Sequence, residues 1–244
     1  MRPRALVIHA RGTNRDQELA RALDIAGAQV DIIPLTVLRE NCRSWTDWEI
    51  LAVPGGFSHG DALGAGRILA LDLMAWFGDQ MRSMSERGSP IIGICNGFQA
   101  LVQAGVLPGA GAPATLTVNE SERFECRWVT LQAIPGSIWT DGLTKPMRCP
   151  VAHREGRYLG DAGRPALRYL DAKGQPAGGA YPANPNGSLN DIAGVCDSTG
   201  TILGLMPHPE DHVLARQDLQ RGRRGDPLLC LDLFRNGIGH AKEI

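Results

Sequence analysis

The chain has 244 residues, of which 43% are hydrophobic and 21% charged, a composition typical of one globular domain with a large apolar core. Its formal net charge of −1 gives no electrostatic reason to expect binding to nucleic acid or to an anionic membrane. We expect no membrane span, because no segment approaches ~18 apolar residues, and no secretion signal, because the first apolar run is too short. Six scattered cysteines without a C-x-x-C pair indicate reduced thiols and a cytoplasmic protein.

The first half of the chain alternates apolar runs with helical patterns. ALVIHA at 5–10 predicts a strand. Asn14 followed by Gln17 predicts a capping box at the start of a helix that Gly27 ends. In chain order, the next elements are expected as a strand at 30–35, a strand running into a loop at 49–56, a longer helix at roughly 64–87 and a buried strand at 90–95.

The second half begins with a different pattern. Residues 115–134 are hairpin-like, and 160–190 are rich in Gly, Pro, Ala and Asn, which favours strands and loops over crossover helices. The earlier pattern resumes with TILGLM at 201–206. Asp226 with Pro227 then predicts the start of a last helix, which is expected to end at Asn236-Gly237.

These elements together predict the fold class. Continuous apolar strands that alternate with helices are typical of a parallel sheet buried on both faces. We therefore expect an α/β fold with a mostly parallel central sheet, helices on both faces and a small antiparallel portion. Because no linker or repeat interrupts the pattern, we expect a single domain over residues 1–244.

The motif Gly93-Ile94-Cys95-Asn96-Gly97 lies between an apolar strand and a helical pattern, as in a nucleophile elbow. A sharp strand-to-helix turn crowds the backbone so that only glycine fits beside it. The turn would expose Cys95, and the start of the helix would stabilise its thiolate. The N–H of Asn96 would face a developing oxyanion. A structural role is the alternative for Cys95, and it is the role expected for Cys42, Cys126, Cys149, Cys196 and Cys230.

A cysteine nucleophile needs a base and a group that holds the base in place. His208 follows TILGLM, so we expect it at the carboxyl end of a strand, where α/β sheets place their ligands. Glu210 lies two residues further on and can accept a hydrogen bond from the ring. Zinc is an alternative for HPEDH at 208–212. It is disfavoured because the H-E-x-x-H order is missing and Pro209 breaks the helix that would align His208 with His212, so we expect no metal.

A third segment, PGGFSHGD at 54–61, also follows a predicted strand. Adjacent glycines let backbone N–H groups approach a ligand closely, as an oxyanion hole or a phosphate cradle requires. A phosphate loop is disfavoured, because no G-K-[ST] follows and the chain has no G-x-G-x-x-G pattern. A simple tight turn remains an alternative, and His59 is a rival candidate for the base.

The segments PGGFSHGD, GICNGFQ and MPHPE resemble the signature segments of class I (triad) glutamine amidotransferases. Further segments, VNESERFECR at 118–127, AHREGRY at 152–158 and NPNGSLNDIAGV at 184–195, are similar to those of the glutaminase subunits of phosphoribosylformylglycinamidine synthase. The matches keep the order of that family and span nearly the whole chain. The resemblance implies a flavodoxin-like α/β amidotransferase domain.

The resemblance also implies a role for each site residue. Cys95 would attack the side-chain amide of glutamine, forming a γ-glutamyl thioester and releasing ammonia. His208 would accept the thiol proton and protonate the leaving amine, while Glu210 would orient the imidazole. The oxyanion would be held by the N–H groups of Gly56 and Asn96. Residues expected near the bound glutamine are Gln99, Asn119, Ser121 and Phe124.

The resemblance further implies partners. Ammonia would pass to a separate synthetase subunit that converts formylglycinamide ribonucleotide to its amidine, usually with a small third subunit bridging the two. ATP and Mg would be used by that synthetase, so no cofactor is expected in this chain, which carries no ATP-phosphate motif.

Three positions depart from the family pattern. His59 stands where Tyr is common, Arg154 replaces a Gly, and Asp211 stands where Arg is common. Arg154 puts in doubt any role that needs bare backbone at that point. None of the three belongs to the predicted triad.

Two other functions fit parts of the pattern. A free-standing cysteine hydrolase of γ-glutamyl compounds would share the triad, but it need not carry the segments at 118–127 and 184–195. A non-catalytic regulatory subunit would keep the fold, but it has no physical need for Cys95, His208 and Glu210 together. The sequence therefore favours a glutaminase coupled to a synthetase.

Overall fold

The computed structural model describes residues 1–41, 44–109, 111, 113–160, 163–218 and 228–244. The strands are β1 (Arg4–His9), β2 (Gln29–Pro34), β3 (Ile50–Val53), β4 (Ile91–Ile94), β5 (Ala114–Thr117), β6 (Glu125–Ala133), β7 (Met147–His153), β8 (Arg157–Gly160), β9 (Arg164–Leu170), β10 (Ile192–Cys196) and β11 (Ile202–Leu205). The α-helices are α1 (Asp16–Ala26), α2 (Leu35–Glu40), α3 (Arg67–Glu86), α4 (Asn96–Gln103) and α5 (Leu231–Ala241). Short 3₁₀ helices are η1 (Trp45–Asp47), η2 (Ser58–Asp61), η3 (Leu189–Asp191), η4 (Pro209–His212) and η5 (Ala215–Gln217).

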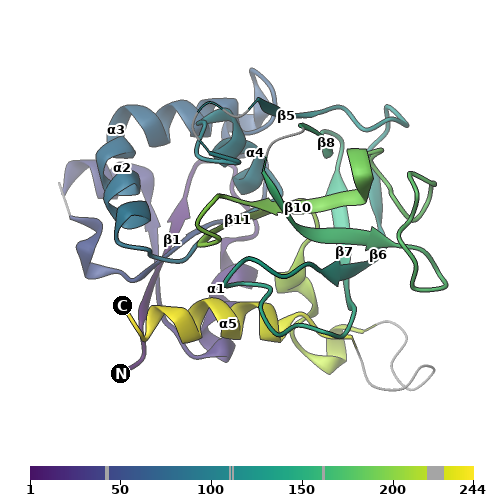
Figure 1. The fold of residues 1–244 in the computed structure, drawn as a ribbon. Helices are drawn as coiled ribbons and strands as arrows, with labels where there is room; N and C mark the ends of the chain where they lie inside the picture. The colour runs from purple at the N-terminus through teal and green to yellow at the C-terminus, as the bar shows by residue number, and fades with distance from the viewer. Residues whose placement is uncertain (42–43, 110, 112, 161–162, 219–227) are drawn as a thin grey trace.

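Within these residues, a nine-stranded sheet runs in the order β2-β1-β3-β4-β11-β10-β9-β6-β7, and β5 pairs with β8 in a separate small sheet (Figure 1). The strands from β2 to β11 are parallel to one another. From β11 to β7 every pairing is antiparallel. The predicted α/β fold, with parallel strands and an antiparallel portion, is confirmed. The antiparallel portion reaches beyond the hairpin-like stretch at 115–134 and includes strands up to β10.

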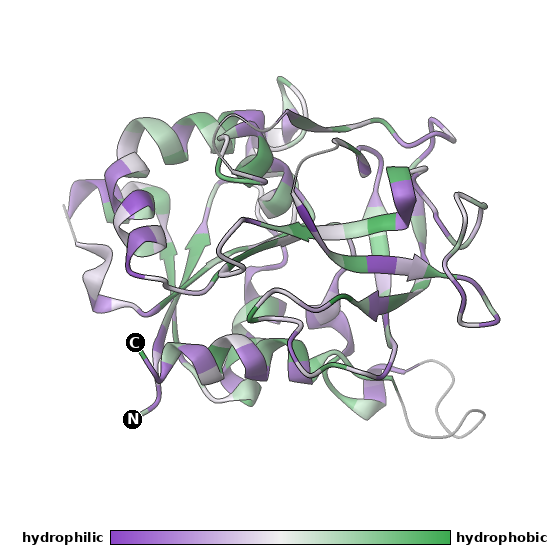
Figure 2. Ribbon diagram, in the orientation of Figure 1, coloured by the Kyte–Doolittle hydropathy of each residue, from purple (hydrophilic) through white to green (hydrophobic). Residues whose placement is uncertain are grey.

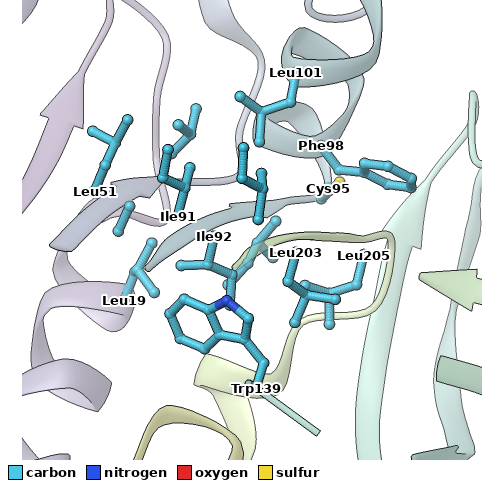
Figure 3. Packing of buried hydrophobic residues seen from close by; sticks show 14 of the residues in the cluster. Leu19, Leu51, Ile91, Ile92, Cys95, Phe98, Leu101, Trp139, Leu203 and Leu205 are labelled. Carbon is cyan, nitrogen blue, oxygen red and sulfur yellow. The ribbon is translucent and has the colours of Figure 1, made fainter. Parts of the chain in front are cut away.

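Helices cover the two faces of the parallel strands, which are buried along their whole length in β3 and β4 (Figure 1). Figure 3 shows Trp139 and Leu19 on one face of β4, and Phe98 and Leu101 on the other. The central strands are hydrophobic in Figure 2, while the helices carry both hydrophobic and hydrophilic residues. This pattern follows from burying each strand on both faces and each helix on one. No described helix is both long enough and apolar enough to cross a membrane.

The predicted capping box at the start of α1 is wrong, although the predicted end at Gly27 is right. The helix begins at Asp16, and its N-cap residue Arg15 makes no side-chain capping hydrogen bond. The preceding residues are held instead by the loop after β3: Thr13 forms a bridge with Gly56, and the N–H of Arg15 donates to a loop carbonyl at 3.3 Å. A contact distant in sequence therefore replaces the local cap. Gly27 ends the helix with a φ of 115°, as glycine allows.

The predicted end of the last helix at Asn236-Gly237 is also wrong, because α5 continues to Ala241. Gly237 lies inside the helix, where a Cβ atom would come within 2.3 Å of the Trp139 ring. Glycine is needed there for close packing and does not end the helix. The predicted helix start at Asp226-Pro227 lies outside the described residues.

Candidate active site

Three neighbouring parallel strands carry the predicted site residues at one edge of the sheet. β3, β4 and β11 lie side by side, with Val53 opposite Gly93 and Leu205 opposite Ile94. Because parallel strands end at the same edge, the loops after them meet there. Those loops contain Pro54-Gly55, Cys95 and the segment that leads to His208.

Cys95 occupies the sharp turn between β4 and α4 that the sequence predicts, but the predicted exposure of its side chain is wrong, because Cys95 is buried with 5% exposure. Its φ of 51° and ψ of −105° are unusual for a residue with a side chain. Two hydrogen bonds hold this conformation: the N–H of Cys95 donates to the carbonyl of Leu205 at 2.8 Å, and its carbonyl accepts from the N–H of Gln99 at 3.0 Å. The side chain lies beyond the end of β4, next to Phe98 (Figure 3). The positive end of α4 therefore faces the sulfur.

The glycines on either side of Cys95 are required by close packing. A Cβ atom on Gly97 would lie 2.0 Å from the carbonyl oxygen of Val53, and one on Gly93 would lie 2.6 Å from the side chain of Leu101. Real Cβ atoms do not approach other atoms so closely. Both glycines thus let α4 lie against β3 and β4, and this packing fixes the position of the nucleophile.

The imidazole of His208 lies beside Cys95 and is held by Glu210. Nδ1 of His208 is 2.7 Å from Oε1 of Glu210, and the two side chains are almost fully buried. A Cβ atom on Gly55 would lie 2.8 Å from Cε1 of His208 and 3.4 Å from Cβ of Cys95. The imidazole and the cysteine therefore pack against the same glycine. Since Nδ1 is taken by the carboxylate, Nε2 is the nitrogen left to exchange protons with a substrate or a thiol.

Opposing effects set the pKa of His208. Burial lowers it, but the Glu210 carboxylate raises it through its charge and its hydrogen bond, and the Cys95 sulfur raises it through its charge, so the net pKa lies well above its usual value. The two partners therefore stabilise the imidazolium form. This arrangement suits a residue that must take a proton from a thiol and later return it.

Replacing Glu210 with glutamine is expected to lower the pKa of His208 and to slow glutamine hydrolysis roughly 10- to 100-fold. The loss should be smaller than for His208→Ala, for which we expect about 10²-fold or more, because Glu210 acts through the base. NMR titration of the His208 ring and steady-state kcat measure the two effects. Asp211→Asn is the matched control, since Asp211 lies in the same turn but points toward Arg15, 3.8 Å away. Equal losses in both variants would contradict the assigned role of Glu210.

The predicted oxyanion residues lie on two sides of Cys95. Asn96 is the first residue of α4, and Gly56 follows the glycine that packs against His208. Among the described residues, neither backbone N–H donates to a backbone carbonyl outside the regular elements. Gly56 itself packs against residues 12–14, where its φ of 142° and the lack of a side chain are both needed. Their role in holding the oxyanion stays a prediction.

The side chains of Asn96 and Gln99 form a buried network behind the nucleophile. The amide of Asn96 accepts from the N–H of Ser58 and donates to Asp61 and to Gln99, each at 3.1 Å. The amide of Gln99 donates to the carbonyl of Glu155 at 2.7 Å. The network ties η2 and the loop after β7 to α4. Gln99 therefore contacts Asn96, the residue after Cys95, and its contact with glutamine stays a prediction.

Asn119 approaches the triad through a residue that the sequence did not single out, His153. The amide nitrogen of Asn119 donates to the carbonyls of Arg123 and His153, both at 2.9 Å. Its amide oxygen accepts from the N–H of Gly156 at 3.0 Å and lies 3.1 Å from Nδ1 of His153. Next to His153, the carbonyl of Ala152 lies 3.8 Å from Sγ of Cys95. Asn119 thus holds the strand end that borders the nucleophile.

The other two predicted substrate residues lie further out. The hydroxyl of Ser121 donates to Glu125 at 2.8 Å, and the side chain of Phe124 is 49% exposed. No described hydrogen bond joins either residue to the triad. Their contact with glutamine stays a prediction.

His153 is buried in its neutral form. Because Oδ1 of Asn119 is an acceptor, Nδ1 of His153 must carry the proton, which leaves Nε2 without one. Burial, reinforced by the neighbouring His208, lowers the pKa of His153 to about 3. A Cβ atom on Gly156 would touch the ring at 2.4 Å, so the imidazole is tightly enclosed. The sequence signal for this residue was the AHREGRY segment.

Protein stability is expected to fall with acidification because of His153. The unfolded chain binds a proton below pH 6.5, whereas the folded chain does so only near pH 3, so lower pH favours unfolding. Between pH 6.5 and pH 5 the loss should be about 2 kcal/mol. Urea unfolding at these pH values measures it. His153→Gln, which cannot titrate, should show a correspondingly smaller loss, and an unchanged loss would rule out His153 as its source.

His59, the rival candidate for the base, and His212, the second histidine of the zinc alternative, both make other contacts in the structure. Nε2 of His59 lies 2.9 Å from Oδ2 of Asp72 on α3, so His59 is paired with that carboxylate. Nδ1 of His212 donates to the carbonyl of Arg148, and the ring packs edge-on against Trp128. Among the described residues, His208, Glu210 and Asp211 are the one group close enough to share an ion. His212 is outside that group.

The side chain of Arg154 is exposed, and its carbonyl accepts from the N–H of Asn119 at 2.8 Å. The site therefore uses the backbone at this position, and an arginine side chain does not prevent it. Gly55, His153 and Glu155 belong to the site, although the sequence assigned none of them a role. Gly55 could have been found in the adjacent-glycine motif, and the other two in AHREGRY.

Comparisons with known proteins identify the family of this chain. Residues 2–240 match the family model of the CobB/CobQ-like glutamine amidotransferase domain. The phosphoribosylformylglycinamidine synthase subunit PurQ of Treponema denticola is 46% identical over 270 residues, which cover 98% of this chain and 99% of that protein. PurQ of Dehalococcoides mccartyi is 42% identical, with 99% and 98% of the two chains covered.

Solved structures give the same result. A chain in the structure of PurLQS from Thermotoga maritima matches with a TM-score of 0.78 and 32% identity, covering 98% of this chain and 99% of that one. A glutamine amidotransferase of Thermotoga maritima, 14% identical with a TM-score of 0.59, shares the fold over the full length of both chains. The chain belongs to the CobB/CobQ-like glutamine amidotransferase family and, within it, to the PurQ subunits of phosphoribosylformylglycinamidine synthase.

Proposed function

We propose that this chain hydrolyses L-glutamine to glutamate and ammonia and supplies the ammonia to a synthetase subunit. That subunit uses it to convert formylglycinamide ribonucleotide to formylglycinamidine ribonucleotide in purine biosynthesis. The observation that carries the proposal is the meeting of Cys95, His208 and Glu210 at the elbow after β4. The proposed reaction is acyl transfer from an amide, which a triad of this kind performs.

The reaction proceeds through a thioester. Cys95 Sγ attacks the side-chain carbonyl of glutamine, while the thiol proton resides on His208. The N–H groups of Gly56 and Asn96 stabilise the oxyanion of the tetrahedral intermediate. His208 then protonates the leaving amine, so that ammonia departs and the γ-glutamyl thioester remains. A water molecule, deprotonated by His208, hydrolyses the thioester and releases glutamate.

The partners follow from the relatives. PurQ of Treponema denticola is a subunit of phosphoribosylformylglycinamidine synthase, and the Thermotoga maritima relative lies within PurLQS. By analogy, this chain binds a synthetase subunit and a small bridging subunit in the cytoplasm. The synthetase uses ATP and Mg, and this chain needs no cofactor of its own.

The test is reconstitution with the synthetase and the small subunit from the same organism. Glutamate release and amidine formation are measured for this chain alone and for the assembled complex. We expect amidine formation from glutamine only in the complex, together with at least a tenfold rise in glutamate release. Full glutamate release by the chain alone, with no amidine in the complex, would favour a free-standing hydrolase. Amidine formation that requires added ammonium even in the complex would favour a non-catalytic subunit.

A further inference from the structure

Three successive residues in the loop after β3 have left-handed backbone conformations. His59, Gly60 and Asp61 have φ angles of 53°, 65° and 50°. Glycine adopts such values freely, but a residue with a side chain costs roughly 1–2 kcal/mol in this region. A segment that carries this cost persists only where its surroundings hold it, and such segments gather at functional sites. The conformation of this loop, which also contains Gly56, therefore depends on contacts from outside it.

The side chain of Asn96, the residue after the proposed nucleophile, supplies such contacts. Nδ2 of Asn96 donates to Oδ1 of Asp61 at 3.1 Å, and Oδ1 of Asn96 accepts from the N–H of Ser58 at 3.1 Å. Asn96 and Ser58 are both buried, each with 2% exposure. One side chain at the start of α4 thus binds the loop on both sides of His59 and Gly60.

Neighbouring donors and acceptors set the orientation of the Asn96 amide. The N–H of Ser58 can only donate, so the atom that it meets is the amide oxygen. Nε2 of Gln99 donates to the carbonyl of Glu155 at 2.7 Å, so Gln99 turns its own oxygen toward Nδ2 of Asn96, at 3.1 Å. Both hydrogens of that Nδ2 are then used, one by Gln99 and the other by Asp61. Without the Asp61 carboxylate, a buried amide N–H would be left unpaired.

These contacts join the two halves of the proposed oxyanion hole. One proposed donor is the backbone N–H of Asn96, the first residue of α4. The other is the N–H of Gly56, two residues before Ser58. Both donors must converge on the oxyanion, and a misplacement of ~1 Å can cost about 10²-fold in rate. The hydrogen bonds of the Asn96 side chain hold the loop and the helix, and hence both donors, at a fixed separation.

We propose that Asp61 is a positioning residue for glutamine hydrolysis. Its carboxylate holds the Asn96 side chain, and that side chain fixes the distance between the N–H groups of Gly56 and Asn96. The inference rests on the proposed function, because it assigns Asp61 a part in the oxyanion step. Asp61 acts through Asn96 and not on the substrate. Its loss should therefore weaken binding of the transition state and leave binding of glutamine nearly unchanged.

Two substitutions separate the side chain of Asp61 from its backbone conformation. Asp61→Gly removes the acceptor and keeps a residue that suits a φ of 50°. Asp61→Asn keeps an acceptor oxygen, and asparagine also tolerates the left-handed region. Asn190→Gly is the matched control, because Asn190 has a φ of 53° and is exposed on η3. In the complex, kcat for glutamate release should fall about 10- to 100-fold in Asp61→Gly, less than about fivefold in Asp61→Asn, and not at all in Asn190→Gly.

A transition-state analogue distinguishes positioning from a purely structural role. L-Glutamate γ-semialdehyde forms a hemithioacetal with a cysteine nucleophile: Sγ bonds to the aldehyde carbon, His208 takes up the thiol proton, and the aldehyde oxygen lies where the oxyanion would. Its inhibition constant should rise in Asp61→Gly by the factor by which kcat/KM falls. Glutamine affinity, measured by calorimetry in the Cys95→Ala background, should change less than about twofold, because the ground state does not depend on the oxyanion donors.

Several outcomes would overturn the inference. They are an unchanged kcat and inhibition constant in Asp61→Gly, equal losses in Asp61→Gly and Asp61→Asn, and a loss of glutamine affinity as large as the loss of kcat/KM. If urea unfolding shows that Asp61→Gly does not fold, Asp61→Ser takes its place, because its shorter side chain withdraws the acceptor from Asn96. A wild-type complex that releases no glutamate would overturn the proposed function and this inference with it. An active wild type that Asp61→Gly matches would overturn the inference alone.

Discussion

Replacing Cys95 with alanine is expected to abolish amidine formation from glutamine, with glutamate release falling at least about 10³-fold. The side chain that would form the thioester is absent, and no other described cysteine lies beside His208 at the end of β4. The fold should persist, because alanine is smaller than cysteine and fits into the space that the cysteine side chain leaves. Glutamate release and amidine formation by the reconstituted complex measure the effect.

Added ammonium distinguishes loss of the nucleophile from loss of the complex. The Cys95→Ala complex should form amidine from ammonium at the wild-type rate, since only the glutaminase step is removed. Cys126→Ala is the matched control, because Cys126 is an exposed cysteine on β6, and it should retain full activity with glutamine. Normal glutamate release by Cys95→Ala would show that another group is the nucleophile.

Replacing Gly97 with alanine is expected to lower the free energy of unfolding by about 3 kcal/mol or more. The new methyl group would lie 2.0 Å from the carbonyl oxygen of Val53 and 2.7 Å from its carbonyl carbon. Both are backbone atoms of β3, so no side-chain rotation relieves the clash. α4 must move away from the sheet and carry Cys95 with it. Glutamine hydrolysis should therefore fall together with stability.

Gly239→Ala is the matched control for this prediction. Gly239 also lies within a helix, α5, but nothing lies within 4 Å of the position of its Cβ. Alanine favours the helix over glycine, so this variant should gain up to about 1 kcal/mol. Urea unfolding of both variants, with glutamate release beside it, checks the pair. A Gly97→Ala protein as stable and active as Gly239→Ala would show that α4 does not depend on that close contact.

The triad shows how far the sequence reaches. The sequence predicts a strand-to-helix turn from Gly93, Cys95 and Gly97. Such a turn needs residues without side chains on both sides of the nucleophile, and this requirement depends only on neighbouring residues. The sequence could not supply the direction of the neighbouring loops. The glycine that packs against both Cys95 and His208 is Gly55, whereas Gly56, predicted for the oxyanion, packs against residues 12–14.

The predictions that failed were those in which a distant contact replaced a local signal. Asn14 and Gln17 have the spacing of a capping box, but contacts with the loop after β3 hold that segment in another conformation. Glycine at position 237 is typical of a helix end, yet Gly237 lies within α5. A glycine is needed there because the Trp139 ring occupies the space that a side chain at position 237 would take. Local preferences amount to about 1 kcal/mol each, and tertiary packing overrides them.

The sequence by itself determined the alternation of strands and helices, the elbow around Cys95 and the family resemblance, because periodicity and backbone torsion are properties of short segments. Only the tertiary structure decided that β11 lies beside β4 and that His153 stays neutral next to His208. Those features depend on which segments become neighbours. That choice is made by the burial of whole strand and helix faces, which no single stretch of sequence contains.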